Sequence, residues 1–361
     1  MTKTVYINGR FLTQGKTGVQ RYAYEMVSAL DRRLSLDETI RNKFSFVLLK
    51  PRVSDFIQLD SIKVISAGIF SGHLWEQAEL PSCARRGFLI NLCNTAPVFK
   101  KDQSITVHDA AVYAFPGAYS LLFRSWYKML LPKLGKNSQV IFTDSRFSRE
   151  ELIRFCGKQF ERAHVLYGSG EHILGVSSES NKDWKYSFSP GQYVLAVGSV
   201  HPAKNIEALK KIAPEILKLG LSLVLVGGIN RKIFKKAEVS AGTDINCLGY
   251  VEESELRRLY ENAFCFLFPS FYEGFGLPAL EAMHCGAPVI VSRTASLPEL
   301  CGDAVLYCDP YNHEDILGSV RKLKKDAHLR QELIEKGKKQ ASRFSWAESV
   351  RKMMELLEDE I

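Results

Sequence analysis

Asn262-Ala-Phe-Cys-Phe-Leu-Phe-Pro-Ser270 and, two residues later, Glu273-Gly-Phe-Gly-Leu-Pro-Ala-Leu-Glu281 form the most informative stretch of this chain. The first part is a short, continuous apolar run ending in Pro-Ser, which predicts a buried strand. The Gly-Phe-Gly turn lets the backbone approach a ligand closely, and Pro278 suits the first turn of a helix. Such a helix directs unpaired N–H groups and the positive end of its dipole at the turn, which favours anion binding there.

The two glutamates of this stretch differ in their expected surroundings. Glu273 lies in the turn, and Glu281 lies about one turn into the helix. One carboxylate can therefore face a reacting group while the other binds a diol further along the same ligand. An ordinary strand–turn–helix with two solvated acids would carry the same glycines, but the whole nine-residue pattern favours a functional site.

Strands alternate with helices along both halves of the chain. We expect strands at 3–8, 44–49, 88–92, 104–108, 139–143, 164–167, 193–197, 222–226, 246–250, 264–268, 288–291 and 305–308. We expect helices at 17–33, 74–86, 118–134, 145–155, 205–219, 253–263, 277–285, 313–325 and 329–343. The alternation predicts an α/β protein with two doubly wound, Rossmann-like domains built on parallel sheets. In such sheets ligands gather at the carboxyl ends of strands, where the four candidate loops at 15–18, 108–109, 199–205 and 273–277 would lie.

The length of 361 residues also favours two domains. The polar, non-periodic stretch 177–191 ends in Pro-Gly and is the best candidate linker. We therefore expect a first domain at 1–180, a second domain at 190–345 and a final helix at 346–361.

Charge is distributed unevenly over a net excess of +8. Residues 1–185 hold 26 basic and 17 acidic side chains, and the remaining residues hold 22 and 23. This asymmetry favours a polyanionic partner such as an anionic membrane face, a lipid diphosphate or nucleic acid, although a merely soluble basic domain would show it as well. No apolar run is long enough to span a bilayer and no signal-peptide core is visible, so a cytoplasmic location is expected. The eight cysteines show neither Cys-x-x-Cys nor a metal-site spacing, as in a reduced compartment.

Several motifs together resemble the retaining glycosyltransferases of family 4. The Glu-x7-Glu block is the specific one, and the order of the other motifs supports it. Gly15-Lys-Thr-Gly-Val-Gln-Arg-Tyr22 is similar to the glycine loop of the family, and Val197-Gly-Ser-Val-His-Pro-Ala-Lys-Asn205 is similar to its phosphate loop. The remaining two motifs are His108-Asp109 and Thr294-Ala-Ser-Leu-Pro-Glu-Leu300. The resemblance runs over most of the chain and is strongest to bacterial O-antigen and exopolysaccharide mannosyltransferases. It implies the GT-B arrangement of two Rossmann-like domains facing a cleft, an acceptor-binding domain at 1–180 and a nucleotide-sugar-binding domain at 190–345. It also implies that the final helix, at 346–361, crosses back to the first domain.

The resemblance also implies roles for individual residues. Glu273 would contact the hydroxyls of the donor sugar, Glu281 would bind the ribose diol, and His108 with Asp109 would lie near the reacting face of the sugar. The remaining donor-binding positions are Gly18, Ser199, Tyr250, Val251 and Gly274, with Tyr250 and Val251 near the base. A satisfied strand-end histidine is the simplest alternative for His108, and an ordinary helix-entry glycine is the simplest alternative for Gly18.

The diphosphate leaving group needs positive charge, and the chain contains no Asp-x-Asp metal anchor. Lys204 and the backbone amides of Phe275, Gly276 and Leu277 are the expected substitutes, so no metal and no cofactor are expected. Related sequences carry an arginine near this lysine, whereas this chain has Ser199 and Ala203. His201 and Arg293 are weak candidates for a second cation.

The segment 118–134 could contact a membrane. Leu121, Leu122, Trp126, Met129 and Leu130 share one broad helical face, and basic residues flank them. A basic amphipathic helix with aromatic rings suits an anionic membrane surface, but core packing of the same face is the commoner explanation. A lipid-linked acceptor would account for both this helix and the basic first half.

The leading hypothesis is a retaining, metal-independent hexosyltransferase for a surface polysaccharide or O-antigen. GDP-mannose is the best guess for the nucleotide-sugar donor, a lipid-linked oligosaccharide is the expected acceptor, and no nucleic-acid partner is expected. The alternatives are a nucleotide-sugar epimerase of the same architecture and a non-enzymatic polyanion-binding protein. Classical retaining hydrolysis uses two close carboxylates, and no second acid is evident here, so front-face attack assisted by the departing phosphate is expected.

Overall fold

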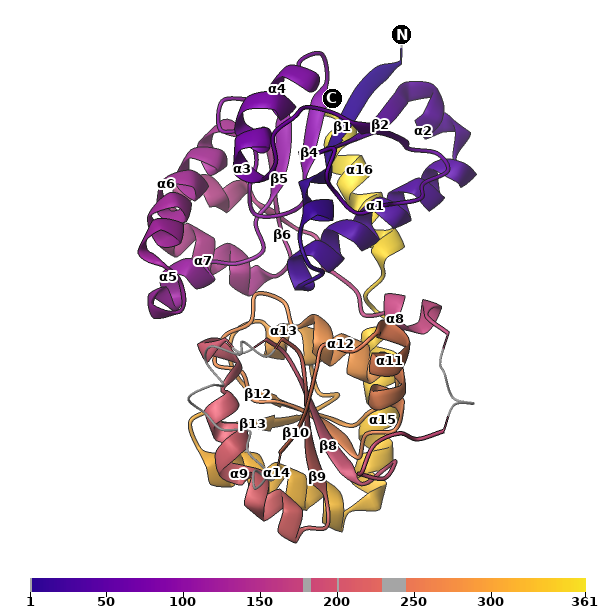
Figure 1. Ribbon diagram of the computed structural model, residues 1–361, viewed down its shortest axis with the longest axis vertical. Coiled ribbons are helices and arrows are strands. Elements are labelled where there is room, and N and C mark those ends of the chain that lie inside the picture. Colours follow the sequence, from indigo (N-terminus) through magenta and orange to yellow (C-terminus); the bar gives the residue numbers. More distant parts are fainter. Residues whose placement is uncertain (1, 178–182, 200, 229–244) are drawn as a thin grey trace. The chain divides into compact units, whose positions relative to one another are not determined.

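The computed structural model describes residues 2–177, 183–199, 201–228 and 245–361. These residues form two compact units, one made of Met1–Gly168 with Trp346–Ile361 and the other of Ser169–Ser345. Each unit is a parallel α/β sheet with packed helices, as the alternation predicted (Figure 1). The boundary at Gly168–Ser169 precedes the expected linker at 177–191, because the short helix α8 (His172–Gly175) already packs on α11 and α12 of the second unit. Residues 178–182 of that linker lie outside the described residues.

Unit 1 has a seven-stranded sheet in the order β3-β2-β1-β4-β5-β6-β7, and each pair of neighbouring strands is parallel. The chain runs outward from β1 through β2 to β3 and then returns to place β4 on the other side of β1. Its strands are β1 (Lys3–Asn8), β2 (Phe44–Lys50), β3 (Lys63–Ser66), β4 (Phe88–Asn91), β5 (Gln103–Thr106), β6 (Val140–Thr143) and β7 (His164–Val165). Its helices are α1 (Gly18–Leu36), α2 (Glu38–Lys43), α3 (Gly72–Leu74), α4 (Leu80–Cys83), α5 (Ala111–Ala114), α6 (Leu121–Asn137), α7 (Arg146–Cys156) and α16 (Trp346–Glu358).

Unit 2 has a six-stranded sheet in the order β10-β9-β8-β11-β12-β13, again with parallel pairings. Its strands are β8 (Tyr193–Val197), β9 (Ser222–Val226), β10 (Ile245–Gly249), β11 (Cys265–Phe268), β12 (Val289–Ser292) and β13 (Leu306–Cys308). Its other helices are α9 (Ile206–Lys218), α11 (Glu253–Glu261), α12 (Leu277–His284), α13 (Leu297–Cys301), α14 (His313–Lys325) and α15 (Ala327–Ala341).

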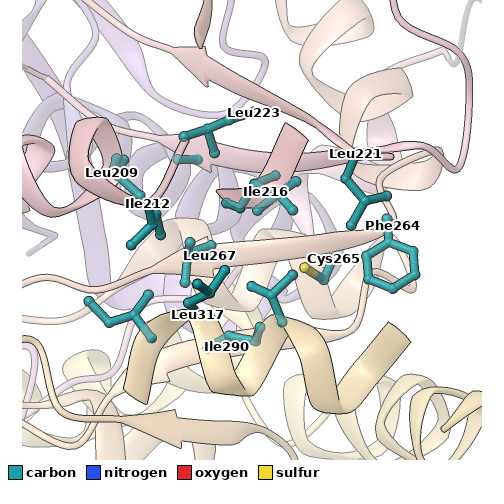
Figure 2. Packing of buried hydrophobic residues seen from close by; sticks show 14 of the residues in the cluster. Leu209, Ile212, Ile216, Leu221, Leu223, Phe264, Cys265, Leu267, Ile290 and Leu317 are labelled. Atoms are coloured by element: carbon teal, nitrogen blue, oxygen red, sulfur yellow. The ribbon is translucent and has the colours of Figure 1, made fainter. Parts of the chain in front are cut away.

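The core of unit 2 shows why the apolar run of β11 forms a central strand. Cys265 and Leu267 point to the face covered by α9 and α14, where they join residues such as Leu209 and Leu317 (Figure 2). Phe266 points to the opposite face, where its ring meets Tyr260 of α11 at 5.5 Å. Both faces of the strand are therefore buried, which is why its sequence is continuously apolar rather than alternating.

The C-terminal helix returns to unit 1, as the resemblance implied. α16 packs on α1, and the rings of Tyr22 and Trp346 meet edge to face at 5.5 Å (Figure 1). The Ser349 hydroxyl donates to the carbonyl of Tyr167 at 2.5 Å. The apolar stripe of α16, which includes Trp346, Met353 and Leu357, is almost fully buried, so the helix contributes part of the hydrophobic core of unit 1.

The sequence predictions missed or misplaced several elements, among them one strand, one helix and one strand end. The edge strand β3 was missed because Lys63-Val-Ile-Ser66 is short and half polar. The expected helix 74–86 is an α3–π–α4 run at 72–83, with a π-helical turn at Trp75–Glu79. The strand expected to end at His108 ends at Thr106, so His108 lies in the loop just beyond the sheet.

Candidate functional site

The turn between β11 and α12 is held by side-chain hydrogen bonds and by glycine. The Ser296 hydroxyl bonds to the backbone carbonyls of Glu273 and Phe275 at 2.9 and 2.6 Å. Gly276 has a φ of +111° at the start of α12, and a Cβ there would lie 2.8 Å from Leu297 Cδ2. Only glycine combines that backbone conformation with so close a neighbour. The positive end of the α12 dipole therefore lies at the Gly-Phe-Gly turn, as the sequence predicted.

Lys204 and Glu273 meet although 69 positions separate them in sequence. Lys204 Nζ lies 2.7 Å from each oxygen of the Glu273 carboxylate and 5.1 Å from the centre of the Phe268 ring. Lys204 follows β8 and Glu273 follows β11, and these strands are neighbours at the point where the strand order of the sheet reverses. Doubly wound sheets bind their ligands at this place.

Asn205 ties the loop that carries Lys204 to the same edge of the sheet. Its backbone is left-handed, with a φ of +55°, and its buried amide donates to the carbonyls of Pro269 and Pro310 at 3.1 and 2.7 Å. The loops after β8, β11 and β13 are therefore held together by one side chain. Asparagine is among the residues that tolerate this conformation best, which explains its position.

Glu281 is held by two buried side chains that the sequence prediction missed. The Tyr260 hydroxyl donates to Glu281 Oε2 at 2.9 Å, and His172 Nε2 lies 3.1 Å from Oε1. Burial raises the pKa of Tyr260 well above its ordinary value, and the Glu281 charge adds to this effect, so the phenol remains a donor. The segment around His172 has no periodicity that could have indicated its role.

His108 is fully engaged within unit 1. Its Nδ1 lies 2.9 Å from Asp144 Oδ2, and its Nε2 lies 2.9 Å from the carbonyl oxygen of Leu92. Because an ionised carboxylate and a carbonyl can only accept, this geometry favours the form in which both ring nitrogens are protonated, the imidazolium. Burial alone would lower the pKa of His108, but the hydrogen bond to Asp144 and the Asp144 charge raise it above its ordinary value. Asp144 directly follows the strand β6, and its strand-end position is the signal that could have found it.

The glycine-loop motif and the His-Asp motif meet at Tyr22. The ring of Tyr22 lies edge-on to His108 at 4.8 Å, and its hydroxyl donates to the carbonyl of Leu166 at 3.3 Å. Asp109 acts locally, since its Oδ1 accepts from the amide of Ala111 at 2.8 Å. The structure thus brings His108 into a packed cluster, and the role of His108 and Asp109 toward a donor sugar stays a prediction.

The other predicted donor-binding residues lie at loops and element ends. Gly18 begins α1 on the surface, and a Cβ there would meet nothing within 4 Å. Ser199 follows β8, and Tyr250 and Val251 follow β10, with Tyr250 66% exposed. None of these positions has a geometry that requires a ligand, so their roles also stay predictions.

Neither candidate for the second phosphate-binding cation gains support. Burial, together with the nearby Lys204 charge, lowers the pKa of His201, which favours its neutral form. Arg293 stacks over the Tyr307 ring at 4.5 Å, at the end of β12. Lys204 therefore remains the one side chain proposed to offset the negative charge of the diphosphate.

Residues 179–340 match the family described as "Glycosyl transferases group 1". O-antigen chain mannosyltransferase B of Escherichia coli is 34% identical over 252 residues, which cover 67% of this chain and 66% of that protein. The serotype-specific mannosyltransferase WbdA of the same species is 31% identical over 239 residues, covering 62% of this chain and 29% of that protein. This chain thus spans less than two thirds of the length of either relative.

A solved structure with the same fold covers nearly the whole chain. Sucrose-phosphate synthase from Thermosynechococcus elongatus aligns with a TM-score of 0.71 and 16% identity, over 99% of this chain and 98% of that one. The fold class is GT-B, with two Rossmann-like domains. Residues 179–340 of the chain belong to the group 1 glycosyltransferases. Within the described residues no helix is both long and apolar enough to cross a membrane.

Proposed function

We propose that this protein is a retaining transferase that moves mannose from GDP-mannose to a lipid-linked oligosaccharide during the synthesis of a surface polysaccharide or O-antigen. The relatives named as mannosyltransferases support the sugar and the pathway. The observation that carries the proposal is the Lys204–Glu273 pair at the reversal point of the second sheet, beside the N-terminus of α12.

The geometry of this pair suits a nucleoside diphosphate sugar. Lys204 supplies positive charge, and the α12 dipole adds to it where the leaving diphosphate would develop negative charge. The Glu273 carboxylate can accept hydrogen bonds from sugar hydroxyls, and Glu281, eight positions further along the chain, can accept from a ribose diol. Lys204, whose side chain is 22% exposed, would then lie between the acid and the diphosphate and attract both.

The proposed reaction needs neither a metal nor a covalent intermediate. Among the described residues no three carboxylate, imidazole or thiol groups are gathered as a metal site would require. Glu273 is engaged by Lys204, which favours a hydrogen-bonding role over that of a nucleophile. We therefore infer front-face attack, with the departing phosphate taking the acceptor proton. A covalent glycosyl–enzyme adduct on Glu273 would contradict this mechanism.

We also infer that α6 contacts an anionic membrane. Leu121 and Leu122 are 72% and 86% exposed, and Met129 is 47% exposed, whereas Leu130 is buried and Trp126 packs on the core. The face predicted from the sequence therefore divides between the core and the surface, and basic residues such as Lys128 and Lys133 flank the exposed part. Co-sedimentation with vesicles containing anionic lipid checks this, and a Leu121→Ser/Leu122→Ser variant should sediment less.

Donor screening tests the proposed function. Wild-type protein is incubated with GDP-mannose, UDP-glucose, UDP-N-acetylglucosamine or dTDP-rhamnose, with and without EDTA, while thermal stabilisation and release of the nucleoside diphosphate are measured. We expect GDP-mannose to stabilise the protein and to be hydrolysed slowly in EDTA. Glu273→Gln should abolish hydrolysis, while Glu332→Gln, on the exposed surface of α15, should leave it unchanged.

The same screen separates the alternatives. An epimerase would convert the nucleotide sugar to an isomer without releasing the diphosphate. A polyanion-binding protein would respond to none of the nucleotides, would bind heparin in a salt-sensitive way, and would be unaffected by Glu273→Gln. Either outcome would overturn the proposed transfer.

A further inference from the structure

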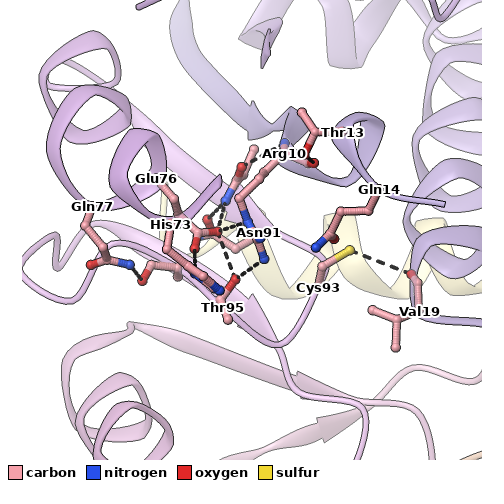
Figure 3. Close-up of polar contacts among 12 residues, drawn as sticks. Arg10, Thr13, Gln14, Val19, His73, Glu76, Gln77, Asn91, Cys93 and Thr95 are labelled. Atoms are coloured by element: carbon pink, nitrogen blue, oxygen red, sulfur yellow. Dashed lines mark hydrogen bonds and ion pairs between the residues drawn. The ribbon is translucent and has the colours of Figure 1, made fainter. Parts of the chain in front are cut away.

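The first sheet has a reversal point of its own, between β1 and β4, and a buried polar network occupies its carboxyl edge (Figure 3). Asn8 ends β1 and Asn91 ends β4, and the amide of Asn8 donates to Asn91 Oδ1 at 2.9 Å. By the same topological rule that places the Lys204–Glu273 pair, this edge is where unit 1 would bind a ligand. The network includes none of the residues assigned to the donor.

A buried ion pair lies at the centre of the network. Glu76 Oε1 accepts from Asn8 Nδ2, Arg10 Nε and Thr95 Oγ1 at 2.9, 3.0 and 2.9 Å. Burial alone would raise the pKa of Glu76, but the hydrogen bond from His73 and the Arg10 charge outweigh it and lower the pKa. The carboxylate is therefore ionised in the interior of the protein. A buried ion pair is weak evidence for a stabilising role, so another reason for its presence is needed.

That reason is the orientation of His73. His73 Nδ1 lies 3.3 Å from Glu76 Oε2, so the carboxylate accepts from Nδ1 and fixes the ring with the opposite nitrogen, Nε2, directed away from it. The side chain of His73 is 40% exposed, whereas that of Glu76 is 1% exposed, so the network reaches the surface through this imidazole. Glu76 belongs to the π-helical turn Trp75–Glu79, and such turns are frequent at functional sites.

Aromatic rings of α6 flank the imidazole. The ring centres of Trp126 and His73 lie 5.8 Å apart, with an angle of 64° between the ring planes. The neighbouring residue Tyr127 stacks on Phe123, with ring centres 4.3 Å apart. Burial raises the pKa of Tyr127 to about 12, so its phenol stays protonated. A fixed hydrogen-bonding group among aromatic rings suits a ligand with both polar hydroxyls and apolar C–H faces.

We propose that His73 binds the saccharide acceptor, with Nε2 forming a hydrogen bond with one of its hydroxyls, and that Glu76 is the positioning residue that fixes the ring. This inference rests on the proposed glycosyl transfer and names the acceptor-binding residue of unit 1. The ligand is a carbohydrate because Nε2 supplies one directional hydrogen-bonding group while Trp126 supplies a ring surface beside it.

Kinetics with model acceptors test this inference. The probes are p-nitrophenyl glycosides of mannose, glucose, galactose, N-acetylglucosamine and rhamnose, with GDP-mannose as donor. We expect His73→Gln to raise the KM for the accepted glycoside about tenfold or more, while donor hydrolysis without acceptor stays within twofold of wild type. His328→Gln, which changes an exposed histidine of α15, is the matched control and should change neither quantity.

An NMR titration keeps the test decisive if no probe is glycosylated. The imidazole signal of His73, assigned by its loss in His73→Gln, should shift with at least one glycoside and not with GDP alone. No shift with any glycoside, or a parallel loss of donor hydrolysis in His73→Gln, would overturn the proposal. Failure of the proposed function would appear differently, as absence of GDP-mannose hydrolysis in the wild type.

Discussion

Each glutamate of the Glu-x7-Glu pair is bound by side chains from distant parts of the second unit. Lys204 contacts Glu273, and Tyr260 with His172 contacts Glu281. Both carboxylates are more than nine-tenths buried, so each depends on its partners for the hydrogen bonds that water would otherwise supply. Changing a partner is therefore a milder test of each site than changing the acid.

Tyr260→Phe should weaken donor binding without preventing folding. It removes the hydroxyl that donates to Glu281 and leaves a buried carboxylate one partner short, which should cost about 1–3 kcal/mol of unfolding free energy. Tyr193→Phe is the matched control, because Tyr193 is equally buried and donates to the carbonyl of Leu259 at 2.6 Å. Urea unfolding and nucleotide affinity are measured for both variants. Equal losses of nucleotide affinity in the two would show that Glu281 is not part of the donor site.

His108 should make unit 1 less stable as pH rises. Its pKa in the folded protein is raised above its ordinary value near 6.5 by Asp144, so its contribution is complete below pH 6.5 and is lost as the pH rises through the folded value. His108→Gln should flatten this dependence, measured as urea midpoints from pH 5.5 to 9.

His164 provides a control of opposite sign for this pH dependence. Burial, with the charges of Arg149 and Arg162, lowers its pKa, so its contribution is lost as the pH falls below 6.5. His164→Gln should therefore change the stability only on the acid side of the pH profile.

An unchanged pH profile in His108→Gln would mean that the His108 ring is not charged in the folded protein.

At the scale of elements, two glycines at helix starts should respond differently to alanine. Gly276→Ala forces a left-handed backbone and places Cβ 2.8 Å from Leu297, so it should destabilise the protein by at least ~1 kcal/mol. Gly18→Ala meets nothing within 4 Å and should leave stability nearly unchanged. If Gly18→Ala nevertheless reduces donor hydrolysis, a ligand approaches that backbone. Thermal melting and hydrolysis rates are compared for both, and full activity in Gly18→Ala would assign Gly18 to helix entry alone.

The elements themselves were largely predictable from the sequence. Apolar runs marked strands such as β8 and β11 because parallel strands are buried on both faces, and caps such as Ser145 marked helix starts. The predictions failed for β3 and for the π-helical turn, where short or mixed patterns do not separate one conformation from another.

At the scale of the whole molecule, α16 should be necessary for unit 1. A chain ending at Ser345 would expose the surfaces of unit 1 that Trp346, Val350 and Met354 cover. We expect this truncation to make unit 1 sensitive to proteolysis. Unit 2 should keep its cooperative unfolding transition, because unit 2 ends at Ser345. A chain ending at Glu358 keeps the helix and is the control. Equal protease resistance in the two chains would contradict the role of α16.

By itself, the sequence determined the fold class, the alternation of strands and helices, the turn that contains Glu273, and the start of α12 after that turn. These are consequences of local conformational preference and of burial, which neighbouring residues encode. The positions of the two sheet reversals, the pairs Lys204–Glu273 and His108–Asp144, the partners of Glu281 and the His73–Glu76 network were decided only by the tertiary structure. Strand order brings together residues that lie far apart in the chain, and no local pattern specifies which strand end will stand beside which.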